Sequence, residues 1–207
     1  MATAKLTAST YYVSSSYLTV ADVTNMYTDT SSTTYGSITN THNSTSYYYF
    51  YLRGFDLDTI PAGATVNSFT VKLRGRASGA YNSAMILCHG TSTIANATAT
   101  QIPNSSSAAT RTFANGSLTW AQIVSYGDDF GIRINCRRNA KNTQSYYYIY
   151  GAEIIVDYTM PSGNAAYIKT SGQWVAATHV YKKISGTWTE QTISPAIFDP
   201  DTKYRGS

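Results

Sequence analysis

The clearest shortage in this sequence is of charged side chains. Asp, Glu, Lys and Arg make up 13% of the 207 residues, about half of the roughly 25% that is usual in soluble proteins. The net charge is only +4, and the basic residues alternate along predicted strands without forming a run. This pattern argues against binding to nucleic acid. Ser, Thr, Asn and 19 tyrosines stand in their place, a composition that favours close packing against proteins or sugars.

Long apolar runs are also missing. No stretch approaches the roughly 20 apolar residues of a membrane-spanning helix, so no contact with a membrane is expected. The first residues contain no apolar h-region, which predicts synthesis in a cytoplasm without a secretory signal. A role outside the cell would then require another route of release.

Motifs of the common catalytic sites are absent as well. The sequence contains no Gly-x-Ser-x-Gly, no His-Glu-x-x-His and no phosphate-binding loop. We therefore predict no enzymatic activity, no catalytic residue and no cofactor. The three histidines, His42, His89 and His179, lack the spacing of metal ligands.

Two pairs of aspartates leave a calcium site open as an alternative. Asp56 with Asp58, and Asp128 with Asp129, could place oxygen atoms around Ca²⁺, although they match no defined loop. Asp56 and Asp58 are more simply expected to cap the turn before Pro61. A pair of carboxylates for glycoside hydrolysis would have to come from the 11 Asp and Glu residues, most of which lie in predicted turns. A polysaccharide-degrading enzyme is thus the weakest alternative.

Only two cysteines are present, Cys88 and Cys136, and each lies within an apolar strand pattern. This placement predicts buried free thiols. A disulfide between them stays open if the two strands are neighbours, but a cytoplasmic product disfavours it.

Residues 47–77 contain the strongest structural pattern, two strands joined by a turn. The second strand alternates apolar and polar residues with a period of two, which is typical of a sheet with one buried and one wet face. The first is aromatic, and Pro61 and Gly63 favour the turn between them. Similar alternation recurs over 130–136 and 146–158. The positions predicted to be buried are Phe69, Val71, Leu73, Phe130, Ile132, Ile134, Ile154 and Val156.

The rest of the chain up to residue 158 also favours short strands, about eight in all, which suits a jelly roll. Residues 25–45 have many turn formers and predict a long loop or irregular edge strand. Residues 118–124 have helical spacing, and Gly127 would end that helix. Strands are predicted at 6–13, 17–23, 47–57, 65–77, 84–88, 130–136 and 146–158, and residues 97–102 and 110–113 have strand potential.

The turn itself carries a resemblance. The run L-x-G-F-D-L-x-x-I-P-x-G-A-T-V, from Leu52 to Val66, resembles a motif in jelly-roll modules of bacterial surface proteins and phage virion proteins. The similarity extends from the aromatic strand to Tyr158. It implies an all-β fold, an antiparallel jelly-roll β-sandwich like that of carbohydrate-binding modules. It implies no catalytic residues, because those modules have none in this motif.

The C-terminal part contains a small repeat. Tyr167–Trp174 and Tyr181–Trp188 share the pattern Y-x-K-x-S-G-x-W with an offset of 14 residues (188 − 174). Each copy predicts a β-hairpin with a Ser-Gly turn. The pattern resembles C-terminal segments of phage tail and capsid-associated proteins. We therefore predict a jelly-roll sandwich over 1–159, a small appendage of tandem β-hairpins over 160–191 and an extended tail over 192–207.

Two tyrosine blocks, 47–51 and 146–150, are candidates for partner binding. The two blocks could lie side by side in one sheet. Alternate rings could form an exposed aromatic surface for a protein or a sugar, or the tyrosines could simply be good strand formers packed across strands. The candidate partner-binding residues are Tyr47, Tyr49, Tyr51, Tyr146, Tyr148, Trp174 and Trp188.

The outward-facing basic residues also allow two interpretations, one functional and one structural. They could form one stripe facing an acidic partner, or they could be an ordinary solvated face. These residues are Lys72, Arg74, Arg76, Arg133 and Arg137.

The resemblance implies a bacteriophage virion structural protein, a capsid decoration, head-fibre or tail-associated subunit. It would bind other virion proteins and its own copies, as a homo-oligomer, and its location would be the virion. The alternative is a carbohydrate-binding adhesin that recognises a host surface glycan.

Overall fold

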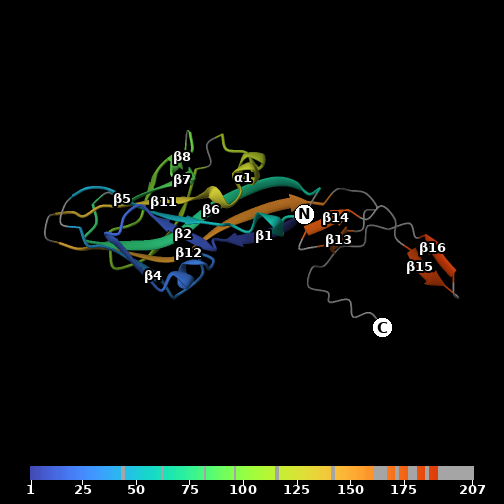
Figure 1. Cartoon of the computed structure of the whole chain (residues 1–207), viewed down its shortest axis with the longest axis horizontal. Coiled ribbons are helices and arrows are strands. Elements are labelled where there is room, and N and C mark those ends of the chain that lie inside the picture. The colour runs from blue at the N-terminus through green and yellow to red at the C-terminus, as the bar shows by residue number, and fades with distance from the viewer. Residues whose placement is uncertain are drawn as a thin grey trace.

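The computed structural model describes residues 1–160 apart from 43–44, 62, 82, 96, 115–116 and 141–142, and the backbone of four strands beyond residue 160. Its main body is made of two antiparallel β-sheets whose inner faces share one apolar core (Figure 1). This confirms the predicted all-β antiparallel sandwich. The jelly-roll winding stays a prediction.

The first sheet, called sheet A, is centred on two long strands. Its strands are β1 (Ala2–Thr7), β3 (Leu18–Ala21), β4 (Gly36–Asn40), β6 (Thr65–Ser78), β10 (Ala109–Thr112) and β12 (Ser145–Thr159). They follow the order β10-β6-β12-β4-β3, and β1 pairs with the far end of β12. β12 therefore has β4 beside its first half and β1 beside its second half.

The second sheet, called sheet B, consists of shorter strands. They are β2 (Thr10–Val13), β5 (Tyr48–Arg53), β7 (Ala84–His89), β8 (Ser92–Thr93), β9 (Thr100–Gln101) and β11 (Phe130–Cys136). They follow the order β2-β5-β11-β7-β8, with β9 also pairing with β7. β5 and β11 thus form the centre of this sheet.

Helices are short and lie in the connections. They are the 3-10 helices η1 (Val23–Met26), η2 (Leu57–Thr59) and η3 (Gly127–Asp129), and the α-helix α1 (Trp120–Tyr126). α1 confirms the helix predicted near 118–124. Thr119 and Gln122 begin it with a reciprocal capping box, and Gly127 ends it with a positive φ of 53°. Among the described residues no helix is long and apolar enough to cross a membrane.

The predicted core is confirmed with one correction. Seven of the eight residues predicted to be buried are fully enclosed, but Phe69 is only half-buried. Its ring packs on Trp120 of α1, with 5.9 Å between ring centroids. The short helix thus covers this position only in part.

Two strands lie outside the predicted strand ranges, the two-residue β8 and the longer β4. β4 lies within 25–45, where the sequence favours a loop or an irregular edge strand, yet it sits between β12 and β3. Ile38 is fully buried opposite Tyr147 of β12, and the Asn40 amide donates a 2.9 Å hydrogen bond to the Cys136 carbonyl. Pairing with β12 therefore outweighs the weak strand propensity of Gly, Ser and Asn.

The C-terminal repeat forms two separate two-stranded antiparallel sheets. β13 (Tyr167–Thr170) pairs with β14 (Gln173–Ala176), and β15 (Tyr181–Ile184) pairs with β16 (Thr187–Glu190). Their registers are equivalent, because Lys169 opposes Trp174 and Lys183 opposes Trp188. Residues 192–207 lie outside the described part of the chain. The domain boundaries at 160 and 192 stay predictions.

The two cysteines are buried free thiols, as predicted. Their strands are neighbours, but Cys88 of β7 lies opposite Gly131, five positions before Cys136 on β11. Cys136 also faces the core, whereas Cys88 alternates with the inward-facing Leu87 and so lies on the other side of sheet B. The geometry therefore excludes the disulfide between Cys88 and Cys136 that the sequence left open.

Neither thiol is expected to react in the native protein. Burial raises the pKa of Cys88 to about 11 and raises that of Cys136 further, so the reactive thiolate is scarce at about pH 8. We expect almost no reaction with Ellman's reagent until denaturant is added, and then two thiols per chain. Rapid labelling of one thiol without denaturant would contradict this placement.

Candidate functional site

The two tyrosine blocks lie in different sheets. The first belongs to β5 of sheet B and the second to β12 of sheet A. The prediction that they could lie side by side in one sheet is therefore wrong. β5 pairs with β2 and β11, whereas β12 pairs with β4, β6 and β1. The outward rings of the two blocks consequently occupy opposite faces of the sandwich.

The outer face of sheet B carries an interleaved set of tyrosine and arginine side chains, called the sheet B layer. Guanidinium carbons lie over the rings: Arg53 is 4.9 Å from the Tyr51 centroid and Arg133 is 4.7 Å from that of Tyr49. Arg137 lies between two rings, 4.8 Å from Tyr47 and 4.4 Å from Tyr81. The layer consists of Tyr12, Tyr47, Tyr49, Tyr51, Tyr81, Arg53, Arg133 and Arg137.

This layer is tightly packed at its centre and open at its margins. Tyr51 is only 3% exposed although it points away from the core, and its burial raises its pKa. Tyr12, Tyr47 and Tyr81 at the margins are 47%, 38% and 48% exposed. Tyr51 therefore packs within the layer and supports it. The marginal rings of Tyr12, Tyr47 and Tyr81 provide most of the area that a partner could contact.

Sheet A carries a second set, called the sheet A layer. The Arg76 guanidinium carbon lies 3.9 Å from the centroid of Tyr148, and that of Arg74 lies 5.2 Å from Tyr150. Tyr35 packs on both rings, at centroid distances of 5.1 and 5.2 Å. The layer consists of Tyr35, Tyr146, Tyr148, Tyr150, Arg74 and Arg76.

Residues 22–35 hold the sheet A layer from outside. Arg74 donates a 3.0 Å hydrogen bond to the Ser32 carbonyl, and the amide of Ala152 donates one of 3.0 Å to the Thr28 carbonyl. Asp29 accepts from Ser31 and pairs with Lys5 at 2.9 Å, and these contacts lower its pKa to about 2. This segment fills the gap beside β12 between β4 and β1.

The five outward basic residues do not form one stripe. Lys72, Arg74 and Arg76 lie on β6 in sheet A, whereas Arg133 lies on β11 in sheet B and Arg137 directly follows it. The single stripe, which the sequence left open as one of two interpretations, is therefore excluded. Alternation places residues on a face of their own strand, but it does not say which strands share a sheet.

Tyr147 has a structural role within the second block. It is fully buried, its hydroxyl donates to the Arg137 carbonyl at 2.9 Å, and it accepts from the Arg137 amide at 2.8 Å. Burial strongly raises its pKa. Tyr147 thus fixes the residue that follows β11, while its neighbours Tyr146 and Tyr148 point outward.

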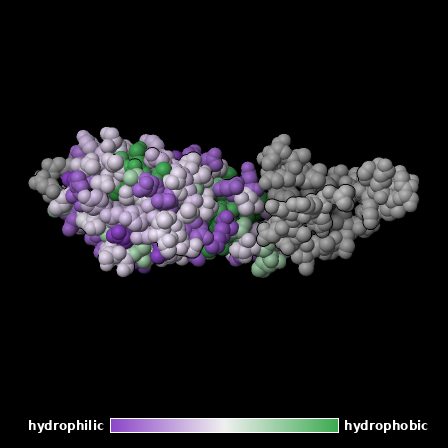
Figure 2. Space-filling view, turned by 90° about the horizontal axis from the view of Figure 1, so that it is seen from below, coloured by the Kyte–Doolittle hydropathy of each residue, from purple (hydrophilic) through white to green (hydrophobic). Residues whose placement is uncertain are grey.

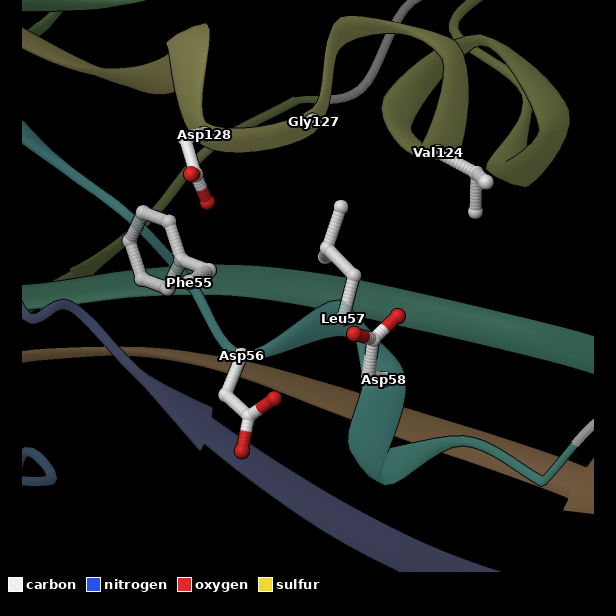
Figure 3. A pocket seen from close by; sticks show the side chains of 7 residues that line it. All are labelled: Phe55, Asp56, Leu57, Asp58, Val124, Gly127 and Asp128. Atoms are coloured by element: carbon white, nitrogen blue, oxygen red, sulfur yellow. The ribbon is translucent and has the colours of Figure 1, made fainter. Parts of the chain in front are cut away.

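Three of the four aspartates considered for calcium line one hollow. Asp56, Asp58 and Asp128 line a shallow hollow of about 270 Å³ with Phe55, Leu57, Val124 and Gly127. In Figure 3 the side chain of Asp56 points away from that of Asp128. Asp129 instead lies 3.4 Å from Arg53. Within the described part of the chain, no group of three acidic, histidine or cysteine side chains could hold a metal ion.

The expected capping role of Asp56 is only partly right. It stands directly before η2, but its carboxylate accepts from the Thr59 hydroxyl at 3.0 Å and from no backbone amide of η2. Of the histidines, His89 stacks on Tyr126 at 4.3 Å and His42 packs against Tyr17 at 4.1 Å. His179 lies outside the described residues.

The side chains of Trp174 and Trp188 also lie outside the described residues, so their role stays a prediction. Three members of the sheet B layer were not predicted: Tyr12, Arg53 and Tyr81. Arg53 could have been found, because it continues the alternation of Tyr47, Tyr49 and Tyr51. Tyr12 and Tyr81 come from distant parts of the chain, and no local pattern joins them to β5.

Comparison with known proteins yields little. No family model and no curated protein matches the sequence. One similar solved structure is titled "CBM4 structure and function". It shares 14% identity with a TM-score of 0.36, and the match covers 69% of this chain and 95% of that one.

Proposed function

We propose that the protein is a non-enzymatic structural subunit that binds neighbouring proteins through its tyrosine–arginine layers. The observation that carries this proposal is the position of the arginines, whose guanidinium groups lie over the outward rings of both sheets. Tyrosine and arginine are the residues most enriched where proteins bind one another. Stacked together, they give a surface whose side chains are ordered before binding, which reduces the entropy cost of association.

The same contacts disfavour a sugar-binding role for these rings. A sugar stacks on an aromatic face, and Tyr49, Tyr51 and Tyr148 each already have a guanidinium over one face. Apolar residues gather in only small areas on the face shown in Figure 2, and most of that surface is neutral to hydrophilic. Such a surface suits a partner that supplies both apolar area and hydrogen bonds.

We place this subunit in a bacteriophage particle, as a capsid decoration, head-fibre or tail-associated protein. The support is the resemblance of Leu52–Val66 and of the C-terminal repeat to segments of phage virion proteins. Its partners would be other virion proteins and copies of itself.

A second candidate is a carbohydrate-binding adhesin. Tyr12, Tyr47 and Tyr81 remain 38–48% exposed, so their rings offer area to a host surface glycan.

The decisive experiment uses particles made without the protein. We expect the purified chain to rebind those particles saturably, to appear in a mass-spectrometric inventory of complete particles, and to give no signal on a host-envelope glycan array. Changing Tyr12 and Tyr47 to alanine should weaken rebinding, because both rings lie at the open margin of the sheet B layer.

The matched control is Tyr17→Ala. Tyr17 is 45% exposed but lies outside both layers, so this variant should rebind particles as the parent does. Saturable glycan binding together with no association with particles would establish the second candidate instead.

A further inference from the structure

We propose that the sheet B layer is the docking face and that its partner is a carboxylate-rich protein surface. This inference rests on the proposed protein-binding function and adds the face and the chemistry of the partner.

The sheet A layer is already occupied by the chain itself. Tyr35 covers Tyr148 and Tyr150, Arg74 bonds to the Ser32 carbonyl, and Arg76 lies 3.4 Å from the Tyr150 hydroxyl. The nearby cation Lys5 is neutralised by Asp29 at 2.9 Å and Glu153 at 3.7 Å. Residues 22–35 thus take up part of the ring area and part of the hydrogen-bonding capacity of this layer.

The guanidinium groups of the sheet B layer carry positive charge that the described chain hardly neutralises. Arg133 and Arg137 form no ion pair with any described residue, and Arg53 has only Asp129, which is 62% exposed, at 3.4 Å. Arg53 is largely enclosed, because its side chain is only 14% exposed and also donates to the Gly90 carbonyl, so Arg133 and Arg137 carry most of the uncompensated charge. Acidic side chains of a partner would complement this charge and replace water as hydrogen-bond acceptors.

The arginines are also held in fixed positions. Stacking keeps Arg133 over Tyr49, while Arg137 donates to the Thr45 carbonyl at 2.7 Å and to the Tyr47 hydroxyl at 3.0 Å. The buried Nε atoms of Arg53 and Arg133 have no hydrogen-bond partner within the described chain. A planar guanidinium held in this way binds a carboxylate through two parallel hydrogen bonds at little further entropy cost.

A protein fits this face better than a nucleic acid or a polysaccharide. The charge of the whole chain is only +4, and phosphate backbones are bound by many more clustered cations. At the centre of the layer, bases and sugars would also compete with Arg133 and Arg53 for the ring faces of Tyr49 and Tyr51.

The test measures the affinity of the intact protein for a synthetic oligo-glutamate peptide, for polygalacturonate and for single-stranded DNA. We expect the peptide to bind most tightly and to weaken as salt screens the charges. Arg133→Gln with Arg137→Gln should weaken peptide binding by roughly tenfold or more, the effect of losing charge-assisted hydrogen bonds. Arg133→Gln alone, which removes no side-chain hydrogen bond between described residues, should cause part of that loss.

The matched control is Arg74→Gln with Arg76→Gln, which removes the same charge from stacked arginines of the sheet A layer. It should leave peptide binding within about twofold of the parent, since these groups lie on the opposite face of the sandwich from the proposed docking face. Equal losses from both pairs, no binding of the peptide, or tighter binding of polygalacturonate or DNA would overturn the inference. If Arg133 and Arg137 variants rebind particles as the parent does, the docking face is wrong although the proposed function stands.

Discussion

Replacing Phe130 by alanine is expected to lower the free energy of unfolding by about 3–5 kcal/mol, the usual cost of removing a buried aromatic ring. Phe130 is fully buried at the start of β11, and its ring lies 6.0 Å from that of Phe55. Both rings belong to the single core between the sheets. The surrounding strands are held by their pairing, so they cannot collapse into the space. Urea denaturation of parent and variant measures the difference.

Phe69→Ala is the matched control, because it removes the same side chain from the same core. Phe69 is only half-buried against Trp120, so the expected loss is smaller, about 1–3 kcal/mol. A Phe130 variant no less stable than the Phe69 variant would mean that the inner and outer faces of β11 are assigned wrongly.

The strands that could be predicted are those in which alternating apolar and polar residues identify the buried face. In β6 and β11 apolar and polar residues alternate strictly, and Val71, Leu73, Ile132 and Ile134 are all fully enclosed. The short helix was predictable for a similar local reason, since Thr119 and Gln122 form its cap and Gly127 ends it. Local sequence is sufficient where the determining interaction lies within a few residues.

The remaining features depend on contacts between distant residues. β5 and β12 have similar tyrosine-rich sequences, but their partners are strands many residues away, and these partners place them in different sheets. Glu153 illustrates the same limit: alternation places it on the wet face, yet it is 2% exposed. It is covered by the segment that contains Thr30, whose hydroxyl donates to it at 2.5 Å.

The segment of residues 28–31 lies very close to β12 at Gly151. Here the pairing of β12 with β6 shifts register, between Ile149 and Gly151. A side chain at 151 would place its Cβ 2.2 Å from the Asp29 carbonyl oxygen and 2.5 Å from that of Thr28. Both neighbours are backbone atoms, which cannot move aside as a flexible side chain would. Residues 28–29 can therefore lie against β12 only if residue 151 is glycine.

Gly151→Ala is expected to lower the free energy of unfolding by about 2–4 kcal/mol, because it overpacks the contact and leaves buried polar groups of β12 unpaired. The Ala152 amide would lose the Thr28 carbonyl, and residues 28–31 should gain protease cleavage and fast hydrogen exchange. The control is Gly90→Ala, whose new Cβ meets nothing within 4 Å but whose φ of +59° is strained for alanine. It should cost about 1–2 kcal/mol and leave residues 28–31 protected. If Gly151→Ala leaves that segment as protected as the parent does, the glycine is not what allows it to lie on sheet A.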